Sequence, residues 1–532
     1  MAHTARTRAS ADQAAEAPSG ARRITIWNGI GFGIGDIFGG GSGALTGTYL
    51  TLFLTTYGGL QIAEATSVQG ISTVISAVTA IVIGALSDRF LRYRVGRRFG
   101  RRRFFLLLGA PLLLLGVAMW LPGLSYWVYF GSFLAWIITL QIIMIPYATL
   151  PSEMATDFTG RTVLSTTRMF FSGLSGALVP AVGAALLALL GQNGTTYTII
   201  GVGFIIVFMI CVLLTHRFTW ERTPSPEELA AATAPPAGGG GWRAAAHSVG
   251  EIVVAYASTL RVRAFQRHLA IYLLGVSFAD VFANVFVFFV IFAWNRDAAF
   301  ASLLLSFAIF TVPLTPVQGW LFAKLGTRGL YTITFGGCIA ALLAMFALAR
   351  SAQTMDPAVW VPLAIVVFCL WLFFKSLVFF TPWQVFPFIP DVDEMITRRR
   401  REGIFASMMR FLRTMTQGIS ITLVGVYLSA SGFDAKRESQ TPEALNALVT
   451  VEIWWVIGGF ALAWIVAAGF ALNKKNHTIL IAEMERLRAG GSKQDVDPAT
   501  RKVVESLTGV AYDACWPDLA VPSAAPAQNP TS

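Results

Sequence analysis

Twelve apolar stretches, each long enough to cross a lipid bilayer as a helix, dominate the sequence. They lie near residues 24–56, 66–87, 104–122, 126–150, 167–190, 196–215, 268–293, 298–322, 329–349, 357–388, 404–429 and 450–473. A helix needs about 20 apolar residues to cross a hydrocarbon core roughly 30 Å thick. Because backbone groups inside lipid must be hydrogen-bonded and alternating-polarity segments are absent, the stretches predict an all-α integral membrane protein.

Charge supports the same conclusion. Charged residues make up 13% of the chain, about half of the roughly 25% found in soluble domains, so lipid must solvate much of the surface. The net charge of +11 would suit nucleic acid, but the basic residues are concentrated in alternate loops. Eight arginines follow the second stretch, whereas the loops near 57–65, 121–126 and 191–197 hold no Lys or Arg. This positive-inside pattern predicts a plasma (inner) membrane protein with both termini cytoplasmic, and no nucleic-acid partner.

The longest interior loop divides the chain into two sets of six stretches. Its centre is rich in Pro, Ala and Gly, as in a flexible linker. The predicted organisation is a cytoplasmic tail (1–23), a six-helix bundle (24–216), a cytoplasmic loop (217–267), a second six-helix bundle (268–474) and a second cytoplasmic tail (475–532), poorly ordered from about residue 487.

The two halves resemble each other where they begin. Arg23 precedes Asp36 by thirteen residues, Arg267 precedes Asp280 by thirteen, and a glycine stands five residues before each aspartate. The shared offsets predict a duplicated architecture. Parallel six-helix repeats are the plan of the major facilitator fold, in which the solute site lies between the two bundles near mid-membrane.

Two carboxylates, Asp36 and Asp280, are predicted to lie deep in the membrane, and no glutamate is. Ionisable groups there cost roughly 2.5–3.5 kcal/mol on insertion scales, so each is a functional candidate. Two interpretations are open for both residues. One is a solute-binding or proton-carrying carboxylate, and the other is a structural carboxylate that joins neighbouring helices through a fixed hydrogen bond.

Other polar residues are candidate solute ligands. Lys375 lies about thirteen residues from the cytoplasmic end of its stretch and is interpreted as a partner of a deep aspartate or as a solute ligand; the alternative is a partner for helix carbonyls. Gln141 is a deep hydroxyl partner, and Trp383 offers a face on which a sugar can stack. Asn284, one turn after Asp280, completes this group.

Coupling to an ion is expected to use Asp280, Asp36 and Lys375. All five histidines are assigned to ends, loops or tails, which disfavours a histidine proton relay. Arg410 and Arg413 lie two to three turns into the eleventh stretch, close enough to the interface for one of them to snorkel. The four cysteines show no metal spacing, so no metal or cofactor is predicted. The chain also lacks a catalytic constellation near an interface, so no enzyme is predicted.

Four motifs resemble those of a known transporter family. They are GIGDIFGGGSG in the first stretch, SDRFLRYRVGRRFGRRR after the second, IPYATLPSEMATDFTGRTVLSTTRMFF after the fourth and PDVDEMITRRRREGIF before the eleventh. Together they resemble the glycoside–pentoside–hexuronide:cation symporters, the melibiose-permease-like branch of the major facilitator superfamily. The resemblance implies alternating-access transport of a carbohydrate together with a cation, by a protein that needs no partner chain and is expected to be a monomer.

The resemblance also implies roles for single residues. Arg168 falls on an arginine associated with the sugar site. Positions of the cytoplasmic motifs, associated with gating, are Glu153, Asp157, Arg161, Asp391 and Glu402. Two interpretations are open for Asp88, Arg89 and the arginines that follow: a topology determinant at the lipid headgroups, and part of a cytoplasmic gate.

The sequence departs from the family pattern at the ion site. The carboxylates of the sodium-linked members match Ser76, Ala80 and Met144 here. Sodium needs oxygen ligands, usually with carboxylate charge, so a proton is the preferred coupling ion.

Two further departures concern the solute. The family lysine in the eleventh helix matches Thr414, and the sugar-contacting aspartate of the melibiose permeases matches Gly40. Lys375 and Asp280 are the hypothesised replacements. The alternatives on the same fold are an uncoupled facilitator or exporter of a polar solute, and a carrier of a lysolipid.

Overall fold

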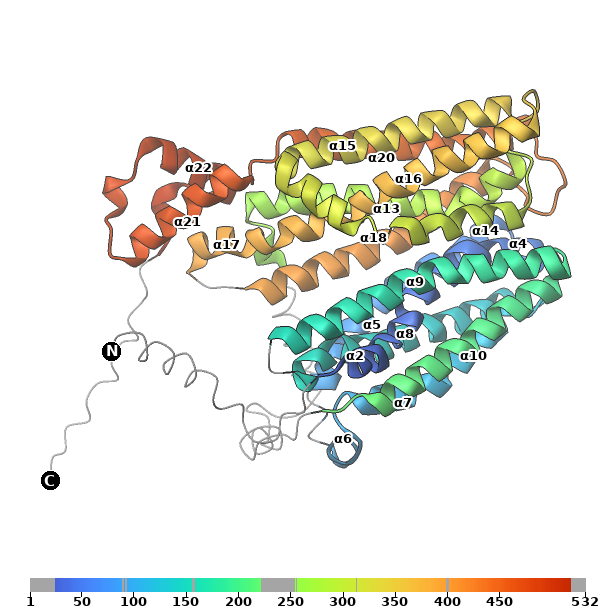
Figure 1. Cartoon of the computed structure of the whole chain (residues 1–532), viewed down its shortest axis with the longest axis horizontal. Coiled ribbons are helices and arrows are strands. Elements are labelled where there is room, and N and C mark those ends of the chain that lie inside the picture. Colours follow the sequence, from blue (N-terminus) through green and yellow to red (C-terminus); the bar gives the residue numbers. More distant parts are fainter. Residues whose placement is uncertain are drawn as a thin grey trace, which may run out of the picture. The chain divides into compact units, whose positions relative to one another are not determined.

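The computed structural model describes residues 24–88, 90, 93–155, 158–221, 254, 256–311, 313–398 and 401–517, and the regular structure in these segments is helical (Figure 1). The chain divides into two compact units. The first comprises residues 1–235 and 298–309, and the second comprises 236–297 and 310–532. The all-α membrane fold is therefore confirmed. The predicted N-terminal tail lies outside the described residues, as does most of the central loop.

The first unit is built on α9, which packs along α2 and α3. Its helices are α2 (Ile26–Gly33), α3 (Asp36–Leu45), η1 (Thr46–Leu50), α4 (Thr51–Thr56), α5 (Ile62–Asp88), α6 (Arg94–Phe99), α7 (Arg103–Leu112), η3 (Leu113–Trp120), α8 (Tyr126–Met154), α9 (Phe158–Leu190), α10 (Gly194–Phe218) and α14 (Ala298–Ser306).

Glycine is required where α3 meets α9. A Cβ atom added at Gly40 would overlap the carbonyl oxygen of Ser172, so the two helix backbones approach too closely for any side chain there. Small residues permit this kind of packing in membranes. The aspartate that the melibiose permeases carry at this position would not fit.

The second unit is built on α13, which packs against α16, α18 and α20. Its helices are α13 (Arg263–Phe292), α15 (Thr315–Ser351), α16 (Pro357–Val385), η5 (Phe386–Phe388), α17 (Ile389–Thr397), α18 (Glu402–Ala430), α19 (Pro442–Val449), η6 (Thr450–Trp455), α20 (Val456–Ala468), α21 (Lys474–Arg488), η7 (Lys493–Asp495), α22 (Pro498–Thr508) and η8 (Tyr512–Ala514); η4 (Phe307–Thr311) follows α14. Gly326 kinks α15 with a φ of 66°.

Nine helices in the described segments are long and apolar enough to cross a membrane. The first expected stretch is missing from this count because it is divided among α2, α3, η1 and α4. The eighth is interrupted after η4, and α18 carries Glu402, Arg410 and Arg413, which lower its hydropathy. The number of twelve helices stays a prediction.

The C-terminal tail is not poorly ordered up to residue 517, so that expectation is wrong. Residues 474–517, here called the C-terminal cap, form the helices α21, η7, α22 and η8 beside α17 (Figure 1). The signals are local. Asp497 caps α22 by accepting the Thr500 N–H, Pro498 is the first helical residue, and Gly509 ends the helix with a φ of 78°.

A buried polar cluster holds the C-terminal cap together. Glu483 accepts hydrogen bonds from Arg486, at 2.8 Å, and from the Tyr512 hydroxyl. Burial opposes the charged form of Glu483, but these hydrogen bonds outweigh it and lower the pKa of the carboxyl. The cap is thus stabilised by a charged glutamate.

The cap is fastened to α17 by charged and aromatic contacts. The Trp516 N–H donates to the Met395 carbonyl at 2.8 Å, and Arg398 lies 4.8 Å from the Trp516 ring centroid. Arg488 forms an ion pair with Glu394. The predicted second tail is therefore, over most of its length, a folded extension of the second unit.

Candidate functional site

Asp36 lies where the first membrane segment tightens by one turn. It is the first residue of α3, and Ile34 and Gly35, which separate it from α2, keep helical backbone angles. The backbone hydrogen bonds here join residues three apart, as from the Ile37 N–H to the Ile34 carbonyl, so the helix continues through a 3₁₀-like turn. The Arg168 Nε donates to Asp36 Oδ2 at 2.9 Å, and its guanidinium lies 5.2 Å from the Tyr147 ring centroid. Asp36 is buried, whereas the Arg168 side chain is 32% exposed.

Asp280 has an arginine partner on α18. Arg413 Nη1 lies 2.6 Å from Asp280 Oδ2, and its Nη2 donates to Oδ1 at 2.9 Å. The arginine therefore approaches both carboxylate oxygens, and the contact to Oδ1 has the geometry of a charged hydrogen bond, while Nη1 and Oδ2 are close without one. Arg413 does not snorkel to the interface. The side-chain amide of Asn284 donates to the Asp280 carbonyl at 2.8 Å, so it bonds to its own helix.

The two aspartates occupy equivalent places in the two units. Each joins the first membrane segment of its half to the fifth, and the paired residues are separated by 132 positions in one case and 133 in the other. This regularity extends the repeat that the shared Arg-to-Asp offset indicates. The arginine partners favour the structural interpretation for both carboxylates, while the exposed part of Arg168 leaves it able to bind a polar solute.

Lys375 on α16 does not form the expected ion pair with a deep aspartate, since Arg413 holds Asp280 instead. Its charge interacts with Asp280 and Glu452 at longer range. Trp383 on the same helix is 42% exposed and meets Tyr272 edge-on, with ring centroids 6.2 Å apart.

Not all the predicted solute ligands lie in one unit. Gln141 is half-buried in α8, and it belongs to the first unit together with Asp36 and Arg168. The other candidates, Asp280, Asn284, Lys375 and Trp383, belong to the second unit.

Glu452 was missed by the sequence reasoning, and the statement that no glutamate lies deep in the membrane is wrong. The twelfth apolar stretch was expected to begin at residue 450, which puts Glu452 at its edge. The helical segment actually begins at Pro442, and Glu452 is fully buried within it. His268, assigned to a helix end, is also fully buried, in α13 between the rings of Phe386 and Phe470.

One predicted gating residue of the first unit, Glu153, lies in a charged cluster. Glu153 at the end of α8 pairs with Arg101, and the Arg102 Nη1 lies 3.4 Å away from it. The neighbouring Glu221, which the sequence did not single out, accepts the backbone N–H groups of residues 101–103 at 2.6–2.8 Å. The two glutamates thus fix the start of α7.

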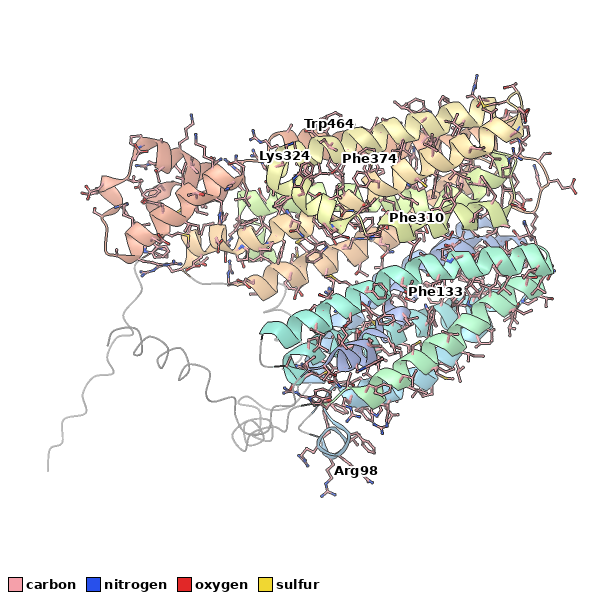
Figure 2. The ribbon with its side chains drawn as sticks, in the orientation of Figure 1. Arg98, Phe133, Phe310, Lys324, Phe374 and Trp464 are labelled. Atoms are coloured by element: carbon pink, nitrogen blue, oxygen red, sulfur yellow. The ribbon has the colours of Figure 1, made fainter. Side chains whose placement is uncertain are left out.

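Other gating predictions of this unit cannot be placed. Arg89 and Asp157 lie outside the described residues, and so do the side chains of Asp88 and Arg161. Arg98 on α6 is exposed and points away from the neighbouring helices (Figure 2), which suits contact with lipid headgroups.

The gating residues of the second unit meet the C-terminal cap. The His477 Nε2 on α21 lies 2.9 Å from Asp391 Oδ2 on α17. Glu402 begins α18. Between them, Arg401 forms two hydrogen bonds with the buried Asp393, at 2.8 and 2.5 Å. Asp393 thus has the closer ion pair, although the sequence comparison pointed to its neighbour Asp391.

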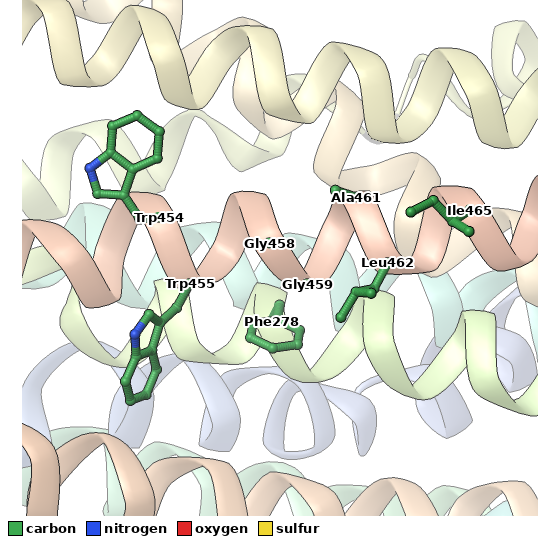
Figure 3. A pocket seen from close by; sticks show the side chains of 8 residues that line it. All are labelled: Phe278, Trp454, Trp455, Gly458, Gly459, Ala461, Leu462 and Ile465. Atoms are coloured by element: carbon green, nitrogen blue, oxygen red, sulfur yellow. The ribbon is translucent and has the colours of Figure 1, made fainter.

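An apolar hollow of about 580 Å³ lies across α20 and α13 (Figure 3). Its lining comprises Phe278, Trp454, Trp455, Gly458, Gly459, Ala461, Leu462 and Ile465. A sugar site needs polar side chains to replace the water around each hydroxyl. The hollow therefore has the chemistry of a lipid-facing surface and not of a carbohydrate site.

Known proteins resemble this chain over most of its length. The family model described as "MFS/sugar transport protein" matches residues 31–472. The isoprimeverose transporter of Lactiplantibacillus pentosus is 22% identical, over 84% of this chain and 88% of its own. The glucuronide carrier protein homolog of Escherichia coli (strain K12) is 21% identical, over 86% and 94%.

Solved structures support the fold. A D-xylose–proton symporter matches with a TM-score of 0.53 and 16% identity, over 83% of this chain and 96% of its own. A peptide transporter of the POT family matches with a TM-score of 0.54 and 12% identity, over 83% and 94%. At this identity the structures bear on the fold alone. The family model, in contrast, covers most of both membrane units described above. The chain therefore belongs to the MFS/sugar transport family.

Proposed function

We propose that the protein carries a sugar or glycoside across the plasma (inner) membrane by alternating access, together with a proton. The observation that supports a carbohydrate most directly is the Asp36–Arg168 pair. Asp36 is buried in the first membrane segment, and Arg168 remains 32% exposed beside Tyr147. A charged donor and acceptor next to an aromatic ring can bind hydroxyl groups and an apolar sugar face together.

The relatives support the same cargo class. Two of them are named for an isoprimeverose and a glucuronide, and both are glycosides.

The positions that match sodium ligands in the family support a proton. The Ser76 hydroxyl is buried and donates to the Thr73 carbonyl of its own helix at 2.8 Å. The Met144 side chain lies against α3 beside Gly39, and Ala80 has no oxygen in its side chain. None of the three side chains carries a negative charge, and only Ser76 has an oxygen, so together they give sodium little to bind.

The test is a pH recording from lightly buffered, de-energised cells that express the protein. Glycosides, pentosides and hexuronides are added one at a time. We expect one class to make the external medium more alkaline, because protons enter with the sugar. Cells that carry Arg168→Gln are expected to lose the response, and cells without the protein provide the baseline.

Two other outcomes would contradict parts of the proposal. Exchange of labelled sugar without any pH change would contradict proton coupling and indicate a facilitator. An absence of both exchange and pH change with every sugar tested would contradict a carbohydrate cargo and turn attention to other solutes, lysolipids included.

A further inference from the structure

One buried carboxylate differs from all the others in the described residues. Five carboxylates are buried there, and four of them have an arginine partner: Asp36 with Arg168, Glu153 with Arg101, Asp393 with Arg401 and Glu483 with Arg486. The fifth is Glu452. Both of its oxygens are buried without a hydrogen bond, and its side chain forms no ion pair with a described residue.

The local backbone around Glu452 is also unusual. Glu452 lies in η6, a π-helical segment of residues Thr450–Trp455 between α19 and α20. Inserted π-turns of this kind are rare and often mark functional sites. A charged carboxylate enclosed without donors is costly, whereas a neutral carboxyl is accommodated far more readily. The surroundings therefore hold Glu452 in its protonated form in this conformation.

A lysine on another helix of the second unit can stabilise the charged, deprotonated form of Glu452. Glu452 interacts electrostatically with Lys375 on α16, and Lys375 also interacts with Asp280 on α13 and with Cys338 on α15. Arg413 on α18 is the other charged group at Asp280, and Tyr272 on α13 lies within the electrostatic range of both. Asp280 is already neutralised by Arg413. Lys375 is thus the cation available to stabilise Glu452 when its carboxyl is charged.

We propose that Glu452 carries the coupling proton and that Lys375 stabilises its deprotonated form. The proposal deepens the proton symport proposed above and rests on it. The carboxylate takes a proton from external water, forming an O–H bond, and that bond breaks when the proton is released to cytoplasmic water. Asp36 and Asp280 stay paired with their arginines and bind the helices together. Lys375 also makes the place unsuitable for sodium, because its positive charge repels another cation.

The structure offers a matched pair of variants for the test. Glu452→Gln keeps the size of the side chain and its hydrogen-bonding atoms but cannot release a proton. Glu443→Gln makes the same substitution in the same membrane segment, at an exposed residue in the first turn of α19. Both variants and the unchanged protein are reconstituted into liposomes and compared with the sugar that the pH recording identifies.

Two transport assays separate coupling from movement of the sugar. Counterflow exchanges labelled for unlabelled sugar at equal pH and needs no net proton transfer. Accumulation is driven by an inward proton gradient, and at one proton per sugar a gradient of one pH unit supports about tenfold accumulation. We expect Glu452→Gln to keep counterflow but lose accumulation, with equal sugar on both sides, and Glu443→Gln to keep both.

A second measurement needs no sugar. In infrared difference spectra of the purified protein in lipid, a protonated carboxyl gives a C=O band that disappears at high pH. We expect one such band to be absent in Glu452→Gln and present in Glu443→Gln. In Lys375→Gln the band should persist to higher pH, because the charge that stabilises the carboxylate is gone.

Each outcome decides the proposal. Normal accumulation by Glu452→Gln, or an infrared band that the variant keeps, overturns the role of Glu452. If Glu452→Gln loses counterflow as well, the infrared band alone decides. If the unchanged protein exchanges no sugar at all, the proposed function fails, while the infrared measurement still tests whether Glu452 is the buried protonated group.

Discussion

Arg413 is the residue whose loss we expect to be most damaging among the membrane ion pairs. It contacts both oxygens of Asp280, at 2.6 and 2.9 Å, and the two side chains are only 16% and 14% exposed. With the charge centres roughly 4 Å apart and an effective dielectric constant near 20, the attraction is about 4 kcal/mol. Arg413→Gln leaves Asp280 buried without its partner, which in proteins costs about 3–5 kcal/mol.

The double variant should be milder than Arg413→Gln alone. Asp280→Asn together with Arg413→Gln leaves no buried charge, so the loss should fall to about 1–2 kcal/mol, since replacement of a whole buried pair is often nearly neutral. Four proteins, the unchanged one, the two single variants and the double variant, complete a cycle that isolates the coupling between the residues.

The assay is thermal inactivation of the purified protein in detergent, followed by size-exclusion chromatography. Because membrane proteins often unfold irreversibly, only the rank order of the midpoints is interpreted. The Asp36–Arg168 pair is the control, since its arginine approaches a single carboxylate oxygen, at 2.9 Å, and is more exposed; it should show a smaller coupling. A double variant as unstable as the sum of its single variants, or a larger coupling for the control pair, would refute this reasoning.

Three further predictions concern packing, the C-terminal cap and its pH dependence. Gly40→Ala should destabilise the first unit by about 1–3 kcal/mol, because its Cβ meets the Ser172 carbonyl; Gly43→Ala, with open space around it, should be neutral in the same thermal assay. Trp516→Ala should destabilise the cap by about 3 kcal/mol, seen as about 100-fold faster hydrogen exchange in residues 474–517. The pKa of Glu483 is lower in the folded cap than its ordinary 4.5, so the unfolded chain binds the proton more readily. The cap should therefore keep its protection above pH 4.5 and lose it as the pH falls past the lowered value, and Glu483→Gln should remove that dependence.

Much of the fold could be predicted because the length of the apolar stretches and the repeat between the two halves leave few alternative architectures. Apolar stretches of about 20 residues can only be helices in lipid, and the structure is helical throughout the described segments. The equal spacing from Arg23 to Asp36 and from Arg267 to Asp280 indicated a duplication. The two aspartates then proved to lie at corresponding places, each with an arginine from the fifth helix of its half.

The arginine partners themselves were harder to identify. Depth along a helix does not show which way a side chain faces, so Arg410 and Arg413 were both interpreted as close enough to the interface for one of them to snorkel. A signal was nevertheless present, because Asp36 and Arg168 are separated by 132 residues and Asp280 and Arg413 by 133. Applying the repeat to pairs of charges, instead of to single residues, would have found both ion pairs.

The C-terminal cap was missed for a different reason. Its composition is polar, and polar composition was taken to indicate disorder. The sequence around α22 nevertheless contains three helix-end signals in order: Asp497, Pro498 and Gly509. Capping signals depend on positions and not on average polarity, so they remain visible where a composition argument fails.

The contrast between capping signals and average composition also explains why Glu452 was missed. Average hydropathy sets the start of a membrane helix where charged residues become rare. A glutamate near the end of the helix moves that predicted start inward, so the glutamate is placed at the edge of the membrane segment. The capping sequence gives a different limit: Thr441 accepts the Ala444 N–H, and Pro442 occupies the first helical position. Counted from Pro442, Glu452 is ten residues into the helix, or about 15 Å at 1.5 Å per residue. Ionisable residues buried in the membrane part of a transporter are often functional. A hydropathy average nevertheless tends to place such a residue at the edge of the predicted helix, where it is not counted as buried. Helix caps therefore deserve to set the limits of membrane segments before their ionisable residues are counted.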